Sequence, residues 1–419
     1  MLAMILAATL TQQIDTAAAR VEGSVIATRR DIHQHPELGN REVRTAKLVA
    51  DRLRALNIEV KEKVAHTGVI GILKGGKPGK VVALRADMDA LPVTEQVDLP
   101  FASKVRTTYN GQEVGVMHAC GHDAHVAILL GVAEVLAGMR EQLPGTVKFI
   151  FQPAEEGAPQ GEEGGADLMV REGALENPKV DAIFGLHVGS RFAVGEIGYR
   201  PEGMMAAVDS FKIVVRGKQT HGAYPWLGVD PIVTASQIVL GLQTIPSRQL
   251  DSTLAPSVVT VGAIHGGVRS NIIPDEVEMI GTIRSLEAKM REDIHARIRR
   301  TAESIASAAG ATATVTITTG YPITYNDLAL TERMAPTLRR VAGNANVRVV
   351  NPVLGAEDFS VFQQKVPGLF FWLGTRPKDQ TPEQAPSNHS PLFYVDESGL
   401  VLGVRAMANV AVDYLTAPR

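Results

Sequence analysis

The stretch TVKFIFQPAEEG, residues 146–157, is almost entirely apolar until it stops at a proline and two glutamates. A short continuous apolar run of this kind is typical of a strand buried on both faces of a sheet. The stretches KVVALRAD (residues 80–87) and DAIFGLH (residues 181–187) also end in a polar residue. Because ligands bind at the carboxyl ends of strands in open α/β sheets, these strand ends predict a functional site.

Helical segments alternate with these strands. Residues 20–57 are expected to be helical except for a break at HPELG, residues 35–39. The segment AHVAILLGVAEVLAGM, residues 124–139, is expected to form a helix with Asp123 as its N-terminal cap. The alternation predicts an α/β fold around a sheet that is covered on both faces.

The middle of the chain has a different pattern. Residues 204–319 contain a half-exposed strand, a helix, two strands, a second helix and a last strand. This β-α-β-β-α-β order is that of a ferredoxin-like domain. We therefore expect an inserted domain over residues 204–319, within a discontinuous domain made of residues 1–203 and 320–419.

Composition excludes several classes of protein. With 419 residues, 45% of them hydrophobic, and a net charge of −3, the chain is expected to be globular, with neither nucleic acid nor membrane as a partner. The apolar start, MLAMILAATL, is too short to span a bilayer. It is expected to be the first turns of a helix in a cytoplasmic protein. The alternative is a periplasmic or secreted protein in which residues 1–12 are the remnant of a signal peptide.

The stretch MHACGHDAH, residues 117–125, contains Cys120, the only cysteine of the chain. Cys120 is therefore expected to be a metal ligand or a nucleophile. Cys-x-His spacing, adjacent glutamates and a histidine at a strand end each have ordinary structural explanations when taken alone. A nucleophile leaves the glutamate pair at 155–156 unexplained, whereas a metal site uses one carboxylate as ligand and its neighbour as general base. Metal binding is the favoured interpretation.

A family resemblance runs from about residue 25 to the end of the chain. The chain resembles the dinuclear-metal amidohydrolases that include hippurate hydrolase, indole-acetyl-amino-acid hydrolases, N-acyl-amino-acid amidohydrolases and, more distantly, aminoacylase and glutamate carboxypeptidase. The motifs that carry the resemblance are RRDIHQHPELG, ALRADMDALPV, MHACGHDAH, FQPAEEG, GLHVG, GKQTHGAYP, GVDPI, NIIPDEVEMIGTIRS, GAEDFS and NHSPLF.

The resemblance implies a fold and a reaction. The expected fold is an α/β catalytic domain of zinc-exopeptidase type with an inserted lid and dimerisation domain. The expected cofactors are two divalent metal ions, zinc or manganese first, with cobalt or nickel as alternatives. The expected reaction is hydrolysis of the amide bond of N-acyl or N-aroyl amino acids, by a homodimer or a higher homo-oligomer. A dipeptidase or carboxypeptidase with the same metal centre is the alternative, and a binding protein without turnover is disfavoured by Glu155.

The resemblance also implies roles for single residues. Glu155 matches the general base, and His221 matches a histidine that reaches the active site of the partner subunit and stabilises the oxyanion. Asn271 and Arg284 match residues that grip the substrate α-carboxylate, although on the sequence alone they would be a turn residue and a surface charge. Trp226 departs from close relatives and either lines the cleft or packs inside the lid. The residues that match metal ligands are Cys120, His122, Glu156, His187 and His389. Asp87 and Asp89 fall where more distant relatives carry a histidine ligand and its orienting aspartate, and in this chain they are expected to position the ligands.

Overall fold

The computed structural model describes residues 2–417, so Met1 and residues 418–419 lie outside it. The chain divides into two compact units. The first unit comprises Met1–Glu202, Tyr325–Val350 and Val361–Arg419, and the second comprises Gly203–Thr324 and Asn351–Ser360. Each unit has its own hydrophobic core.

The first unit is built on an eight-stranded mixed sheet with the order β1-β2-β6-β3-β7-β18-β8-β17. The central strands β6, β3, β7 and β18 run parallel, and the antiparallel pairs lie toward the edges. The strands are β1 (Glu59–Val64), β2 (Gly68–Lys74), β3 (Lys77–Asp87), β6 (Pro144–Gln152), β7 (Ala182–Ala193), β8 (Ile197–Tyr199), β17 (Val347–Val349) and β18 (Gly368–Arg376).

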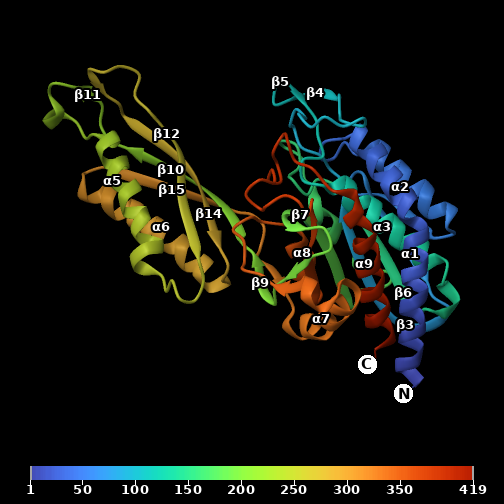
Figure 1. The fold of residues 1–419 in the computed structure, drawn as a ribbon. Coiled ribbons are helices and arrows are strands. Elements are labelled where there is room, and N and C mark those ends of the chain that lie inside the picture. The colour runs from blue at the N-terminus through green and yellow to red at the C-terminus, as the bar shows by residue number, and fades with distance from the viewer. Residues whose placement is uncertain (1, 418–419) are drawn as a thin grey trace. The chain divides into compact units, whose positions relative to one another are not determined.

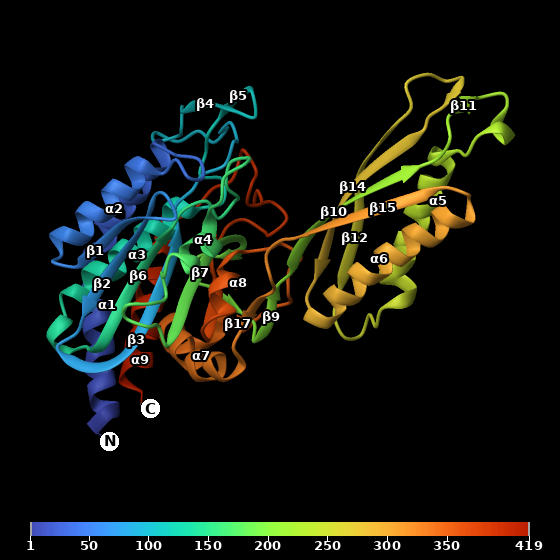
Figure 2. The ribbon, with the colours of Figure 1, turned by 180° about the vertical axis from the view of Figure 1, so that it is seen from behind.

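Helices pack against this sheet and bury its apolar strands. Figures 1 and 2 show α1 (Leu2–Gln34), α3 (His122–Ala137) and α9 (Leu400–Thr416) running together along one side of the sheet. Large side chains such as Phe149, Phe184 and Phe371 are fully buried, and each stabilises the fold by about 1.5–3 kcal/mol. The remaining helices and the small hairpin are α2 (Val43–Ala55), α4 (Gly165–Arg171), α7 (Leu328–Ala342), α8 (Phe359–Gln363), β4 (Arg106–Tyr109) and β5 (Gln112–Gly115).

The apolar start of the chain is helical, because α1 begins at Leu2. Within residues 2–417, none of the helices combines the length and the apolar character that a membrane span needs. The expected first helical turns are therefore present, except at Met1, which lies outside the described residues.

Two local expectations were wrong. The N-cap of α3 is Gly121, in a left-handed conformation with φ +95°, and not Asp123. Asp123 lies inside the first turn, where its carboxylate is 2.7 Å from Arg29 Nε and 2.8 Å from His33 Nδ1, so a buried ion pair takes the place of a cap. The strand β7 does not end at His187, because pairing with β18 continues past the Trp372–His187 register.

The second unit is a four-stranded antiparallel sheet with the order β12-β14-β10-β15 and two helices on one face (Figure 1). Its elements follow the ferredoxin-like order β10 (Ala207–Arg216), α5 (Pro231–Thr244), β12 (Ser257–Gly266), β14 (Glu276–Ser285), α6 (Ala288–Ala308) and β15 (Thr312–Thr319). A small ladder joins β11 (Thr220–His221) to β13 (Ile272–Ile273). The chain passes between the units at β9 (Glu202–Met205) and β16 (Thr324–Asn326), and again at the two ends of the segment Asn351–Ser360. The predicted fold class, an α/β domain with a ferredoxin-like insertion, is confirmed.

Candidate metal centre

Cys120 lies at the centre of a cluster of side chains from distant parts of the sequence. Its Sγ is 3.3 Å from His187 Nε2 on β7 and 3.3 Å from His389 Nε2 near the C-terminal helix. The loop that carries Cys120 lies tightly against β7, because an ideal Cβ at Gly121 would be 2.2 Å from Val188 Cγ2. Glycine at this position therefore allows the approach of the thiol to His187.

His122 occupies the first turn of α3, one residue after the glycine N-cap. Its Nδ1 is 3.2 Å from Asp89 Oδ1, which orients the ring. Its Nε2 is fully buried, has no hydrogen-bond partner among the described residues, and lies 3.9 Å from Glu155 Oε2. A buried ring nitrogen without a partner is costly unless a ligand occupies it.

Two groups of possible ligand atoms share Cys120. One group is Cys120, His122 and His187, and the other is Cys120, Glu156 and His389, with the atoms of each group within 4.8 Å of one another. Glu156 Oε1 lies 3.1 Å from His389 Nε2. Thiolate, imidazole and carboxylate together suit a borderline divalent cation. The five predicted ligands thus lie together and fit a pair of cations.

Electrostatics favour a cation at this place. Burial and the charge of Glu156 raise the pKa of the Cys120 thiol, so the isolated thiol stays protonated. Hydrogen bonds with Cys120 and Glu156 raise the pKa of His389. A divalent cation that binds here must therefore displace protons, and its charge stabilises the thiolate that ligates it.

The two aspartates predicted to orient ligands have different partners. Asp89 holds His122 through Oδ1, and its Oδ2 accepts a hydrogen bond of 2.9 Å from the backbone N–H of Glu156. Asp87 is 2.6 Å from His125 Nδ1 and also pairs with Arg85. Asp89 therefore contacts two predicted ligands directly, whereas Asp87 contacts His125 and lies 3.8 Å from Nδ1 of the predicted ligand His122.

His125 belongs to a third group of ligand types, with Asp87 and His122, but both of its ring nitrogens are engaged. Nδ1 contacts Asp87, and Nε2 accepts a hydrogen bond of 2.9 Å from the backbone N–H of Val188. We therefore assign His125 to bracing β7 rather than to the metal.

Asn388 is a further residue of the site that the sequence analysis did not name: its amide donates to the carbonyl oxygens of Cys120 and Val188 at 3.1 and 3.2 Å. Its place directly before His389 was the only signal in the sequence.

The centre is open on one side. The side chains of Cys120 and His122 are buried, whereas the side chain of His389 is 55% exposed. Glu155 is 6% exposed and lies next to the predicted ligand Glu156. The cluster is therefore accessible to solvent on the side of His389.

The second unit carries the other predicted site residues. His221 is exposed on β11, and its Nδ1 accepts a hydrogen bond of 3.0 Å from the backbone N–H of Ala223. In its neutral form the ring therefore carries its proton on Nε2, as a donor that faces solvent. The backbone of Asn271 is next to it, because Gly222 N–H donates to Asn271 O at 2.8 Å.

Arg284 lies on β14 of the same unit and is half-buried. Its guanidinium makes no hydrogen bond or ion pair with the described residues, and burial lowers its pKa without removing its charge. Trp226 is 74% exposed, so it does not pack inside the domain. Both side chains are available to a ligand or a partner.

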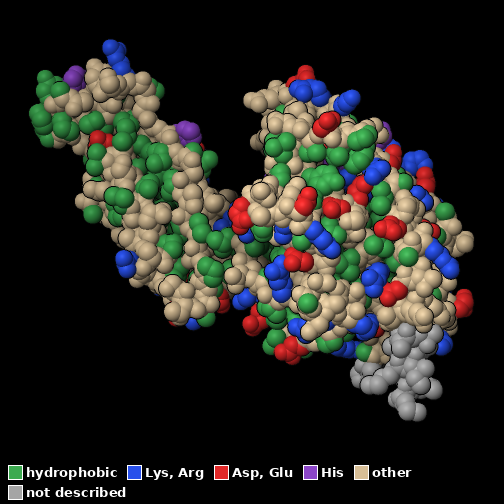
Figure 3. Space-filling view, viewed as in Figure 1, with side chains coloured by type: hydrophobic (Ala, Val, Ile, Leu, Met, Phe, Trp, Pro, Cys, Tyr) green, Lys and Arg blue, Asp and Glu red, His purple; other side chains and the backbone are tan. Residues whose placement is uncertain are grey.

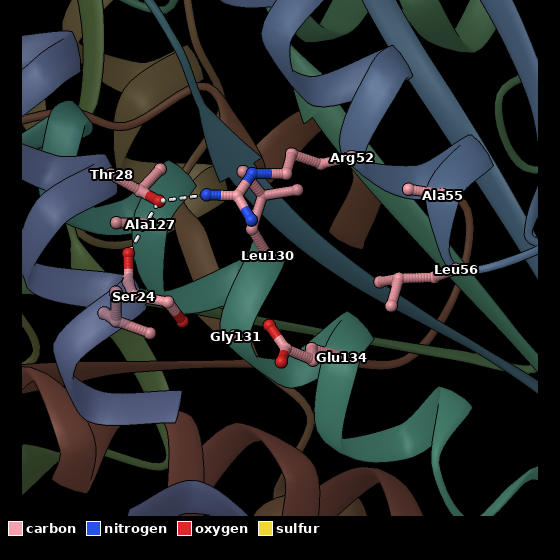
Figure 4. A pocket seen from close by; sticks show the side chains of 10 residues that line it. Ser24, Thr28, Arg52, Ala55, Leu56, Ala127, Leu130, Gly131 and Glu134 are labelled. Carbon is pink, nitrogen blue, oxygen red and sulfur yellow. Dashed lines mark hydrogen bonds between the residues drawn. The ribbon is translucent and has the colours of Figure 1, made fainter. Parts of the chain in front are cut away.

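A separate cavity of about 150 Å³ lies between α1, α2 and α3 (Figure 4). Arg52 and Glu134 line it, and Arg52 donates to Thr28 Oγ1 at 3.3 Å. None of the predicted catalytic or ligand residues lines this cavity. The candidate site is therefore the cluster around Cys120.

Comparison with known proteins agrees with this site. The sequence profile of peptidase family M20/M25/M40 matches residues 83–413. Thermostable carboxypeptidase 2 of Saccharolobus solfataricus is 44% identical over 407 residues, which cover 97% of this chain and 99% of that protein. N-acetylcysteine deacetylase of Bacillus subtilis is 40% identical over 389 residues, which cover 93% and 96%.

A solved structure is similar over nearly the whole chain. A dinuclear metal-binding peptidase of the M20 family from Bacillus subtilis has a TM-score of 0.78 and 37% identity, and the match covers 95% of this chain and 99% of that one. The family and the enzyme class predicted from the sequence are thus confirmed. The chain belongs to peptidase family M20/M25/M40 and is a hydrolase.

Proposed function

We propose that this chain hydrolyses the amide bond of N-acyl or N-aroyl amino acids and releases a carboxylic acid and a free amino acid. The observation that carries the proposal is the position of Cys120, whose Sγ lies 3.3 Å from both His187 and His389 with Glu155 and Glu156 beside it. The named similarity to an N-acetylcysteine deacetylase supports an N-acyl amino acid as substrate.

The proposed ligands are Cys120, His122, Glu156, His187 and His389, with zinc or manganese as the preferred ions. When bound, two divalent cations supply Lewis acidity and lower the pKa of a water molecule. Glu155 accepts the proton of the attacking water and later delivers it to the leaving amine. Glu155 is buried beside His122, so its carboxylate lies next to the proposed metal ligands.

The second unit is proposed to bind the substrate. Arg284 offers a planar, charged donor that matches a free α-carboxylate, and Asn271 adds an amide. The exposed Nε2–H of His221 is suited to stabilise an oxyanion, in the active site of the partner subunit. These roles make the second unit a lid and a dimerisation domain.

The surface of the second unit supports a homodimer. Ten of the seventeen exposed large hydrophobic side chains in the described residues lie between Tyr224 and Ile280. Figure 3 shows hydrophobic side chains on the visible face of this unit, where charged side chains are sparse. The strand β12 pairs only with β14, so its other edge is free to pair with a second copy.

A carboxypeptidase or dipeptidase activity is the second candidate, because the Saccharolobus solfataricus relative is named as a carboxypeptidase. A hydrolysis screen separates the two. Enzyme reconstituted with zinc or with manganese is given N-acetyl, N-benzoyl and indole-acetyl amino acids, and free-amine dipeptides with the same C-terminal residue. We expect a higher kcat/KM for the N-acyl substrates, and a preference for the dipeptides would overturn the proposal in favour of the second candidate.

A further inference from the structure

The segment HPELGNRE, residues 35–42, connects α1 to α2 and has no part in the reaction proposed above. Glu42 stands at the N-cap position of α2, yet its side chain makes no capping hydrogen bond. Glu37 takes that role, since its carboxylate accepts 2.9 Å hydrogen bonds from the backbone N–H groups of Arg44 and Thr45. The side chain of Glu42 is therefore free for another task.

Glu42 turns into the interior, where it is completely buried. Its Oε1 accepts a hydrogen bond of 2.9 Å from the backbone N–H of Ala154, and its Oε2 is 2.5 Å from Thr67 Oγ1. It makes no ion pair with the described residues, which is unusual for a buried carboxylate. Burial and the nearby charge of Asp89 raise the pKa of Glu42 to about 8, so the carboxyl is mostly neutral at pH 7.

The partner of Glu42 is the residue directly before the proposed general base. Ala154 has φ +51°, a left-handed conformation that a side chain with a Cβ disfavours. On the other side of Glu155, the N–H of Glu156 donates to Asp89 Oδ2 at 2.9 Å. Two buried carboxyl groups thus hold the backbone immediately before and immediately after Glu155.

The rest of the segment lies close beneath the same turn. An ideal Cβ at Gly39 would be 2.9 Å from Gly157 O and 3.1 Å from Ala154 Cβ. Asn40 donates to Glu163 O at 3.0 Å, farther along the loop. Residues 39–42 therefore form a support for the turn that carries Glu155 and Glu156.

We infer that Glu42 is a positioning residue, which fixes the left-handed turn at Ala154 and thereby aims the carboxylates of Glu155 and Glu156 into the metal centre. This inference rests on the proposed function for the role of Glu155 as base. For Glu156 the inference is independent of the proposed function, because the position of Glu156 governs metal affinity. A neutral hydrogen-bonding group of the same shape is sufficient for this task, so glutamine can replace Glu42 and alanine cannot.

The test compares Glu42→Ala with Glu42→Gln in the full-length protein. For Glu42→Ala we expect kcat to fall about 10- to 100-fold with KM changed less than about threefold, and Zn²⁺ affinity, measured by competition with a chromophoric chelator, to fall about 10-fold. Glu42→Gln should restore kcat and Zn²⁺ affinity to within about threefold of wild type. The matched control is Glu163→Gln, which alters an exposed carboxylate that pairs with Arg171 in the loop after Glu156 and should leave both quantities unchanged.

Several results would overturn the inference. One is a folded Glu42→Ala protein with wild-type kcat and Zn²⁺ affinity, and another is a Gln variant as impaired as the Ala variant. If Glu42→Ala does not fold, Thr67→Val removes only the hydroxyl at Oε2 and should lower kcat about 2- to 10-fold, so an unchanged kcat would count against the inference. If the wild type hydrolyses no N-acyl amino acid, the proposed function fails, while the Zn²⁺ affinities still decide the role of Glu42.

Discussion

The predicted site residues of the two units differ in how firmly they are held. In the first unit, Cys120, His122 and Glu155 are buried, and hydrogen bonds with Asp89, Asn388 and Glu42 fix the ligands or the backbone around them. In the second unit, His221 is exposed, and Arg284 makes no hydrogen bond or ion pair with the described residues, although the charge of Asp209 acts on it. Metal ligands need supporting contacts that hold their geometry before the metal binds, whereas groups that bind a substrate can be ordered by the substrate or by a partner. This difference predicts where a substitution abolishes the reaction and where it only weakens binding.

The largest effect is expected for Glu155→Ala. Loss of the group that accepts and returns the proton should lower kcat about 10³- to 10⁴-fold while the bound metal remains. Steady-state kinetics with metal analysis by mass spectrometry measures both. The control is Glu163→Gln, because the Glu163 side chain is 70% exposed in the same loop and pairs with Arg171. Retention of more than a tenth of kcat by Glu155→Ala would refute its role as base.

A second prediction concerns the ligand that both groups share. Because Cys120 belongs to both groups, Cys120→Ser should lower occupancy of both cations, whereas His187→Ala should lower mainly one.

Removal of metal from the wild type by a chelator should lower Tm by about 3–6 °C, relative to protein in a free metal concentration of 100 times the Kd of the metal. Calorimetry and metal stoichiometry test this. A Cys120→Ser protein that keeps two tightly bound ions would contradict the shared ligand.

A third prediction concerns the exposed His221. If it acts across subunits, Glu155→Ala and His221→Ala proteins, each inactive alone, should recover activity when mixed under conditions of subunit exchange. A heterodimer has one intact site, so random mixing should give about a quarter of wild-type activity. The control mixes Glu155→Ala with the Glu155→Ala/His221→Ala double variant, in which no intact site can form. Absence of recovery despite demonstrated exchange would place His221 outside the partner's site.

The smallest effect is expected for Arg284→Ala. Loss of a charged hydrogen bond to the substrate α-carboxylate should raise KM about 10- to 100-fold for an N-acyl amino acid and leave kcat within a fewfold. The corresponding N-acyl amino amide, which lacks the carboxylate, should be hydrolysed equally by both proteins. Arg216→Ala, an exposed arginine on β10 paired with Glu276, is the control. An equal loss with both substrates would show that Arg284 supports the sheet and not the substrate.

The sequence predicted the position of the site residues that directly follow the end of an apolar strand. The apolar strand β6 ends just before Glu155 and Glu156, at the edge of the sheet where the site lies, but His187 lies inside β7 and not at its end as the sequence predicted. His389 lies in a loop with no periodic pattern, and only the resemblance predicted that it joins Cys120. The roles of His221, Asn271 and Arg284 stay predictions.

What the sequence did not predict depends on contacts between distant segments. Asp123 was expected to cap α3, but Arg29 and His33, about ninety residues earlier in the chain, hold its carboxylate instead. Glu42 and Asn388 act through backbone groups of other segments, and no local spacing encodes such contacts. Ion pairs and hydrogen bonds between segments that are distant in the sequence are therefore the features that the sequence does not reveal.

The contact of Cys120 with His389 also has a consequence for biosynthesis. The two residues are 269 positions apart, and Glu156 and His187 lie between them. At about 5–20 residues per second, a ribosome needs on the order of tens of seconds to pass from the first ligand to the last. During that interval the thiol is present but the set of proposed ligands is incomplete, and the contiguous segment Gly203–Thr324 is synthesised within it. Loading of the complete centre must therefore be a late event, after translation of His389, and premature capture of a thiophilic metal by Cys120 is a hazard that the nascent chain faces.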